Sequence, residues 1–162
     1  MNSTSNRSTR LRYLVAAVVA CAALATAVAV SAAAAGGTSV TTIHLVGHET
    51  QSKVLSQGGF GDEVIFTGNL DNAAGSQVGI FGGTLTSVSS ATPPLNMATV
   101  DLQLQGGQIT VQGFFPPNQS PIVHAVTGGT GIYRGARGEF SFTEPARGVL
   151  DITVTLLRPG QQ

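Results

Sequence analysis

After residue 35 the chain consists of short runs rich in β-branched residues, separated by glycine and proline. All 21 glycines and all seven prolines of the 162 residues lie in this part. Turn-forming residues between short β-branched runs are typical of an all-β domain. No stretch after residue 36 repeats apolar residues at helical spacing, so we expect no long helix.

Eight strands follow from the alternation of apolar and polar residues. They are predicted over residues 41–48, 63–70, 77–88, 98–105, 108–114, 122–127, 133–143 and 149–157. The clearest alternation is in 98–105, where Val100, Leu102 and Leu104 share one face and Asp101 lies on the other, solvated face. Short connections without crossover helices require neighbouring strands to be antiparallel.

An antiparallel sheet of this size either splits into a sandwich or closes into a barrel. Glycines interrupt the third strand, at Gly79, Gly82 and Gly83, and the seventh strand, and such breaks let a sheet curl and close. Closure also removes exposed strand edges. We therefore predict an all-β fold with a single eight-stranded antiparallel barrel over residues 36–162. A barrel of this size is filled by side chains or holds one small ligand.

The first 35 residues have the layout of a secretory signal peptide. Arg7, Arg10 and Arg12 precede an uncharged apolar run over 14–30, and small residues follow over 31–35. This order predicts cleavage near Ala35 and a secreted, extracellular product. The alternative is an uncleaved anchor, because the apolar run of 17 residues approaches the length of a membrane span. Membrane contact is expected only through this segment.

Cys21 is the only cysteine in the sequence, and it lies within the apolar run. Val18-Val19-Ala20-Cys21 resembles a lipidation site, but the residues that follow stay apolar, which favours a discarded peptide. The predicted mature chain of 127 residues then contains no cysteine, so disulfides, zinc–thiolate sites and thiol nucleophiles are excluded.

The charges of the predicted mature chain argue against a nucleic-acid partner. Five basic and eight acidic side chains lie after residue 35, a net charge of −3. The basic residues are scattered, and none of them form a stripe that could follow a phosphate backbone.

The most distinctive segment is Thr127–Gly138, with the sequence TGGTGIYRGARG. It resembles the GGTG-aromatic-x-x-AR-G signature of dirigent proteins and the related allene oxide cyclase-like barrels. Gly61–Phe66, Gly75–Gly79 and Gly106–Ile109 match the order of strands and turns in that superfamily. The resemblance extends from Gly61 to Leu157. We expect the protein to be a secreted, actinobacterial member of that superfamily.

The resemblance implies an eight-stranded barrel with an apolar cavity, no cofactor, and assembly into a dimer or trimer. It also implies that the protein binds a small hydrophobic molecule and guides its stereoselective cyclisation or isomerisation. Enzymatic activity is left open, because the alternative is a non-catalytic extracellular binding or interaction barrel with a filled core.

Four residues are candidates for catalysis: Arg137, Glu139, Tyr133 and His124. Arg137 and Glu139 share a strand face. If that face is inward, the pair can polarise a carbonyl or stabilise an enolate, and if it is outward, it is a surface pair of little consequence. Tyr133 either caps the cavity with its hydroxyl or packs at the start of its strand. His124 lies in the middle of a predicted strand, where it is either a catalytic residue or a hydrogen-bonded histidine of the core.

The sequence gives little support for a metal site, a hydrolase site or a phosphate-binding site. His44 and His48 share a face but lie ~13 Å apart along an extended strand, too far to chelate one ion. No G-x-S-x-G elbow is present. Arg134 stands where a dinucleotide-binding motif needs its third glycine.

Overall fold

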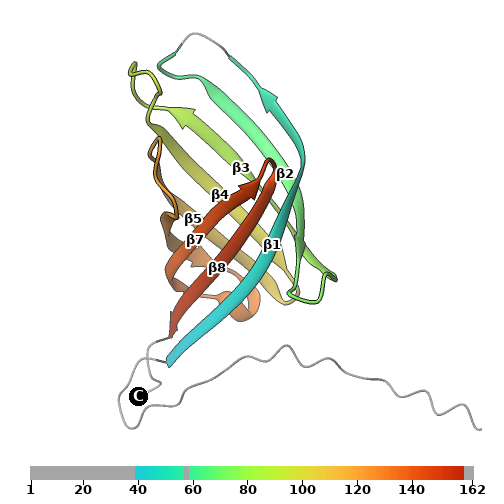
Figure 1. Cartoon of the computed structure of the whole chain (residues 1–162). Coiled ribbons are helices and arrows are strands. Elements are labelled where there is room, and N and C mark those ends of the chain that lie inside the picture. Colours follow the sequence, from blue (N-terminus) through green and yellow to red (C-terminus); the bar gives the residue numbers. More distant parts are fainter. Residues whose placement is uncertain (1–38, 57–58, 159–162) are drawn as a thin grey trace, which may run out of the picture.

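A computed structural model, which describes residues 39–56 and 59–158, shows a closed antiparallel barrel (Figure 1). The predicted signal peptide, residues 1–35 with Cys21, lies outside the described residues. The strands are β1 (Ser39–Val54), β2 (Glu63–Asp71), β3 (Gln77–Ser87), β4 (Asn96–Leu104), β5 (Gly107–Phe115), β6 (Ile122–Gly129), β7 (Arg137–Ala146) and β8 (Val149–Arg158). A short 3₁₀ helix, η1 (Gly131–Tyr133), precedes β7.

Pairing between the first and last strands closes the barrel. Each strand pairs with the next, and β8 returns to β1 in a continuous antiparallel ladder that places Leu45 opposite Ile152. The predicted all-β, eight-stranded antiparallel barrel is confirmed. Among the described residues, no helix has the length and apolar character needed to cross a bilayer.

Alternation along each strand separates a buried inner face from an exposed outer face. In β4, Val100, Leu102 and Leu104 are buried inside, whereas Asp101 is exposed and accepts a hydrogen bond from the Thr110 hydroxyl, 2.7 Å away. The inner faces of all eight strands meet in one hydrophobic core. Burial of these side chains is the main favourable term in the stability of a chain without disulfides among its described residues.

The segment that resembles the superfamily signature closes one end of this barrel. The backbone N–H of Ile132 in η1 donates to the Gly106 carbonyl at 3.0 Å, and that of Thr130 donates to the Gln108 carbonyl at 2.9 Å. These bonds tie the β6–β7 connection across the β4–β5 turn. Ile109, which follows that turn, is completely buried.

The two largest differences from the predicted boundaries are at the end of β1 and at the start of β7. Residues 51–54, which lie between the predicted strands 41–48 and 63–70, continue β1 because Ser52 and Val54 pair with Phe66 and Val64 of β2. Tyr133 ends a 3₁₀ helix and does not start β7. The extended chain is interrupted there because Gly131 and Gly135 have positive φ values of 58° and 73°.

Truncation of the core at the closed end should destabilise the barrel. We expect Ile109→Ala to lower the free energy of unfolding by about 2–5 kcal/mol, because a fully buried side chain is replaced by a cavity. Urea denaturation measures the change. The exposed neighbour Gln108 provides the control, and Gln108→Ala should change stability by less than about 0.5 kcal/mol. Equal stability of both variants would contradict the burial of Ile109.

Candidate active site

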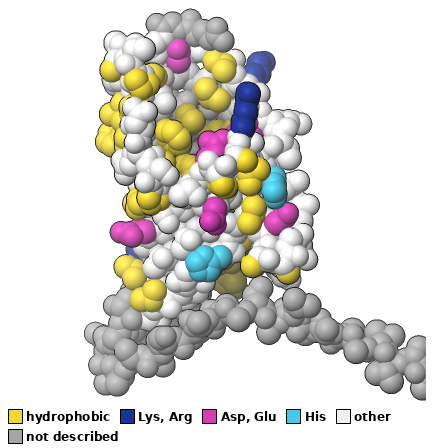
Figure 2. Space-filling model, in the orientation of Figure 1, with side chains coloured by type: hydrophobic (Ala, Val, Ile, Leu, Met, Phe, Trp, Pro, Cys, Tyr) yellow, Lys and Arg dark blue, Asp and Glu magenta, His cyan; other side chains and the backbone are white. Residues whose placement is uncertain are grey.

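An apolar cavity of about 140 Å³ lies inside the barrel, in the half away from η1. Its wall consists of inward side chains from β1 to β8, with aliphatic residues such as Leu102 and Ile152 at its inner end. Figure 2 shows hydrophobic side chains recessed in a hollow of the surface, with charged side chains beside it. The cavity therefore meets solvent at one side of the barrel.

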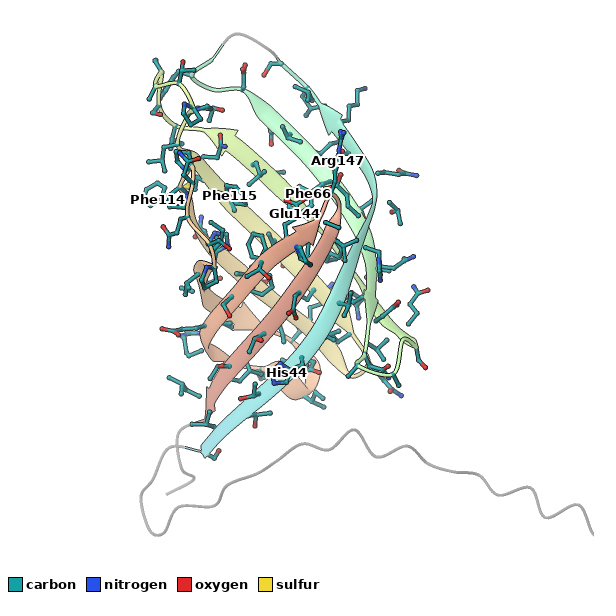
Figure 3. The ribbon with its side chains drawn as sticks, viewed as in Figure 1. His44, Phe66, Phe114, Phe115, Glu144 and Arg147 are labelled. Carbon is teal, nitrogen blue, oxygen red and sulfur yellow. The ribbon has the colours of Figure 1, made fainter. Side chains whose placement is uncertain are left out.

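Aromatic side chains dominate this cavity. Its phenylalanines are Phe66, Phe81, Phe115, Phe140 and Phe142. The ring centroids of Phe115 and Phe142 are 5.9 Å apart, and those of Phe140 and Phe142 are 5.7 Å apart, which are distances of favourable aromatic pairs. Phe66 and Phe115 come from opposite walls (Figure 3). The wall of the cavity is thus mainly aromatic and apolar.

The absence of a side chain at Gly68 makes room for one of these rings. A Cβ at this position would lie 2.5 Å from Cε1 of Phe81, far inside van der Waals contact. Gly68 is paired with Phe81 on β3, so the ring lies across the β2 backbone. This glycine therefore has a packing role in the cavity wall.

His124 on β6 is the polar exception in the cavity. Its side chain is only 3% exposed and stacks on Phe140, with ring centroids 6.2 Å apart. Nε2 lies 3.0 Å from the carbonyl oxygen of Phe114. Since a carbonyl only accepts hydrogen bonds, Nε2 carries the proton, and Nδ1 is left with a lone pair. Nδ1 is buried and has no hydrogen-bond partner among the described residues.

The neighbouring strand sets the orientation of the imidazole. A Cβ at Gly113 on β5 would lie 2.5 Å from Cδ2 and 2.9 Å from Cγ of His124, so the Cγ–Cδ2 edge of the ring rests directly on that glycine. A buried acceptor without a partner, such as Nδ1, costs about 1–3 kcal/mol.

Burial also determines the charge of His124. Desolvation lowers the pKa of the imidazole below 6.5, and the hydrogen bond with Phe114 offsets part of this effect. The side chain is therefore neutral near pH 7. A neutral imidazole with a free lone pair can accept a hydrogen bond or a proton from a bound molecule.

Two carboxylates, Glu49 and Glu144, lie where the cavity meets solvent. The backbone N–H of Gly148 donates to Oε1 of Glu144 at 2.8 Å, and the backbone N–H of Glu49 donates to the Gly148 carbonyl at 2.8 Å. Neither carboxylate was predicted from the sequence as a site residue. Glu144 could have been found, because it follows Phe140 and Phe142 at alternate positions on β7.

Arg137 and Glu139 do not reach the cavity. Both are exposed on the outer face of β7, so the inward arrangement does not occur. The inner positions of β7 belong to Gly138, which lies between Arg137 and Glu139, and to Phe140, which follows Glu139. The Arg137 guanidinium donates to the carbonyl oxygens of Thr127, at 3.0 Å, and Ala136, at 2.8 Å. Arg137 therefore fastens the β6–β7 connection, a structural role for the arginine of the motif.

Tyr133 is partly buried against the core at the closed end of the barrel. It lines a separate depression with Ile132 and Leu157, far from His124 along the barrel. Of the four predicted catalytic residues, only His124 lines the apolar cavity.

The other two histidines lie on the outer face of β1. Nδ1 of His44 is 3.2 Å from the Thr153 hydroxyl, and Nε2 of His48 is 3.5 Å from a carboxylate oxygen of Asp71. Within residues 39–56 and 59–158, no three His, Cys, Asp or Glu side chains are grouped to hold a metal ion.

No protein-family model matches the sequence, and neither does any curated protein. Solved structures do match. A pyocyanin demethylase is 27% identical with a TM-score of 0.62, covering 72% of this chain and 98% of its own. An exo-specific intermolecular Diels–Alderase is 16% identical with a TM-score of 0.63, covering 75% and 99%. A pterocarpan synthase dirigent protein is 16% identical with a TM-score of 0.62, covering 80% and 91%.

The fold is that of the dirigent-like and allene oxide cyclase-like barrels. This agrees with the superfamily suggested by Thr127–Gly138. Within this barrel fold, however, that segment closes the end opposite the apolar cavity. Its glycines and Arg137 therefore maintain the architecture, and none of them lines the apolar cavity.

The buried imidazole should make stability depend on pH. Because the folded-state pKa of His124 is lowered, the unfolded chain binds the proton more tightly, and stability is lost as pH falls below about 6.5 toward the folded-state pKa. His124→Phe should remove this component, up to about 1.4 kcal/mol per pH unit. Urea denaturation between pH 7.5 and 5 measures both proteins. A wild-type slope in His124→Phe would contradict the assignment.

Gly113 should be required for the position of His124. Gly113→Ala should displace the imidazole, weaken its bond to Phe114, and destabilise the protein by about 1–3 kcal/mol through overpacking. The ¹⁵N chemical shifts of the imidazole report the hydrogen-bonded tautomer, and urea denaturation reports stability. Gly128→Ala on β6 is the matched control, because a Cβ there meets no atom within 4 Å. An unchanged imidazole spectrum in Gly113→Ala would refute this role.

Proposed function

We propose that this barrel binds one small aromatic or conjugated molecule and guides its cyclisation or isomerisation without a cofactor. The observation that carries the proposal is a cavity walled by phenylalanine and aliphatic side chains, with one neutral imidazole, that of His124, in its lining. Apolar walls supply binding energy, and the imidazole is the polar group that orients the ligand.

The size of the cavity restricts the ligand. A volume of about 140 Å³ is close to that of an engineered apolar cavity, of about 150 Å³, that binds benzene. The enclosed space therefore takes about one ring. A larger ligand extends to the mouth, beside Glu49 and Glu144.

The proposed chemistry relies on confinement and one basic group. Aromatic walls restrict a flexible reactant to folded conformers close to the transition state, which lowers the entropic part of the barrier. His124, neutral near pH 7, accepts a hydrogen bond from a hydroxyl or takes a proton from an acidic position. Surroundings of low polarity strengthen that hydrogen bond. No step requires Arg137, Glu139 or Tyr133.

The similar structures support this class of reaction. They include a Diels–Alderase, a further cyclase that catalyses a [4 + 2] cycloaddition, and pterocarpan synthase dirigent proteins. The pyocyanin demethylase, at 27% identity, suggests pyocyanin as the first ligand to try. We further propose that the chain acts outside the cytoplasm, on the basis of its signal-like residues 7–35.

A non-catalytic binding barrel is the second candidate function, and the modest enclosed volume favours it. The two functions differ in turnover. A binding barrel releases its ligand unchanged, whereas a cyclase or isomerase releases a product of the same mass with a different chromatographic retention time. Chromatography with mass spectrometry after incubation with polyene or quinone-type model substrates separates the two.

Binding of a hydroxyl-bearing ring should depend on His124. We expect 1-naphthol to bind more tightly than 1-methylnaphthalene by about 3–10-fold, the value of one hydrogen bond. His124→Phe should remove the preference while the ring still binds. Isothermal titration calorimetry measures both ligands, with pyocyanin as a third.

His44→Phe, which changes an exposed histidine on the outer face, serves as the control and should keep the preference. Equal affinities of the two naphthalenes for the wild-type protein would remove His124 from ligand recognition. Failure of all three ring compounds to bind would reject the proposed ligand class.

A further inference from the structure

The charged groups that line the cavity are both acidic. Glu49 and Glu144 belong to its lining, and no lysine or arginine does. His124 adds no positive charge near pH 7, because burial lowers its pKa. A ligand in the cavity therefore meets two carboxylates and one neutral acceptor.

The β7–β8 hairpin holds the two carboxylates at the same edge of the cavity. Gly148 is bonded to both residues, through its N–H to the Glu144 carboxylate and through its carbonyl to the backbone of Glu49. Oε1 of Glu144 has this one bond, and neither Oε2 of Glu144 nor the carboxylate of Glu49 has a hydrogen bond among the described residues. The mouth of the cavity therefore has carboxylate oxygens that can accept further hydrogen bonds.

No fixed cation neutralises these carboxylates within the described residues. The single close contact there between a basic and an acidic side chain joins His48 Nε2 to a carboxylate oxygen of Asp71, 3.5 Å apart on the outer face of the barrel. Arg147 is the nearest basic residue in the chain and stands at the tip of the same hairpin (Figure 3), but it forms no ion pair with Glu144. Lys53 is exposed near the outer end of β1, also without an ion pair.

The aromatic walls act in the same direction as the carboxylates. The faces of Phe66, Phe81, Phe115, Phe140 and Phe142 carry the negative part of the ring quadrupole. A cation close to such faces is attracted, and the attraction grows when water is excluded. A negatively charged ligand meets repulsion from both the rings and the carboxylates.

We propose that the ligand of this barrel is a cationic aromatic molecule, with one ring among the phenylalanines and its positive charge at the mouth beside Glu49 and Glu144. Two observations carry this proposal independently: the unneutralised carboxylates at the mouth, and the apolar cavity behind them, which five phenylalanines line. The inference rests on the proposed function and specifies its substrate class.

Three probes of nearly equal shape test the sign of the charge: N-methylquinolinium, 1-methylnaphthalene and 1-naphthoate. Isothermal titration calorimetry at pH 7.5 and low salt measures each one. We expect the cation to bind about tenfold more tightly than the neutral ring, and the carboxylate to bind more weakly than the neutral ring. Salt should reduce the preference, because the carboxylates are exposed.

The double variant Glu49→Gln/Glu144→Gln should reduce the cation preference to about twofold, the remaining contribution of the aromatic walls. Glutamine keeps an acceptor for the Gly148 N–H, so the hairpin is preserved. Asp151→Asn is the matched control, because it removes an exposed carboxylate from β8 outside the cavity lining.

The outcomes separate this inference from the proposed function. If 1-methylnaphthalene binds as tightly as N-methylquinolinium, the ring site stands and the cationic ligand is rejected. An unchanged cation preference in the double variant also rejects the role of the two carboxylates. If none of the three probes binds, the proposed aromatic site and this inference both fail.

Discussion

The ladder between β1 and β8 is the interaction on which the rest of the structure depends. It runs from Ser39 opposite Arg158 to His48 opposite Val149 and converts a curved sheet into a barrel without edges. Closure creates an interior of buried side chains, with an apolar cavity that opens to solvent. Each polar group inside then needs a partner or must be neutral, because solvation is lost.

His124 illustrates the consequence of this enclosure. Its ring is neutral, one nitrogen donates to the Phe114 carbonyl, and the other is buried without a hydrogen-bond partner among the described residues. The same histidine on the outer face would be an ordinary solvated side chain, as the exposed His44 is. The chemistry of the cavity is thus a product of burial and of the glycine at position 113 against which the ring rests.

The barrel has a structural end and an open end, and they use different residues. At the closed end, η1 and Arg137 hold the β6–β7 connection in place by backbone and side-chain hydrogen bonds. At the open end, the β7–β8 hairpin presents Glu144 beside Glu49. Residues that make the fold recognisable are therefore separated from those that line the cavity. Similar barrels occur in a demethylase, a Diels–Alderase and dirigent proteins, as expected where a fold does not fix function.

The sequence by itself determined the strands, their antiparallel order and the inner face of β4, because period-two alternation and glycine turns are local properties. It also marked His124 as a candidate. It could not place Arg137 outside the barrel or bring Glu49 to Glu144, which lie 95 positions apart in the chain. Those positions depend on the register of β7 against β8 and on closure by β1. Register and closure are set by pairings between distant strands, and a shift of one residue would exchange every inner and outer side chain.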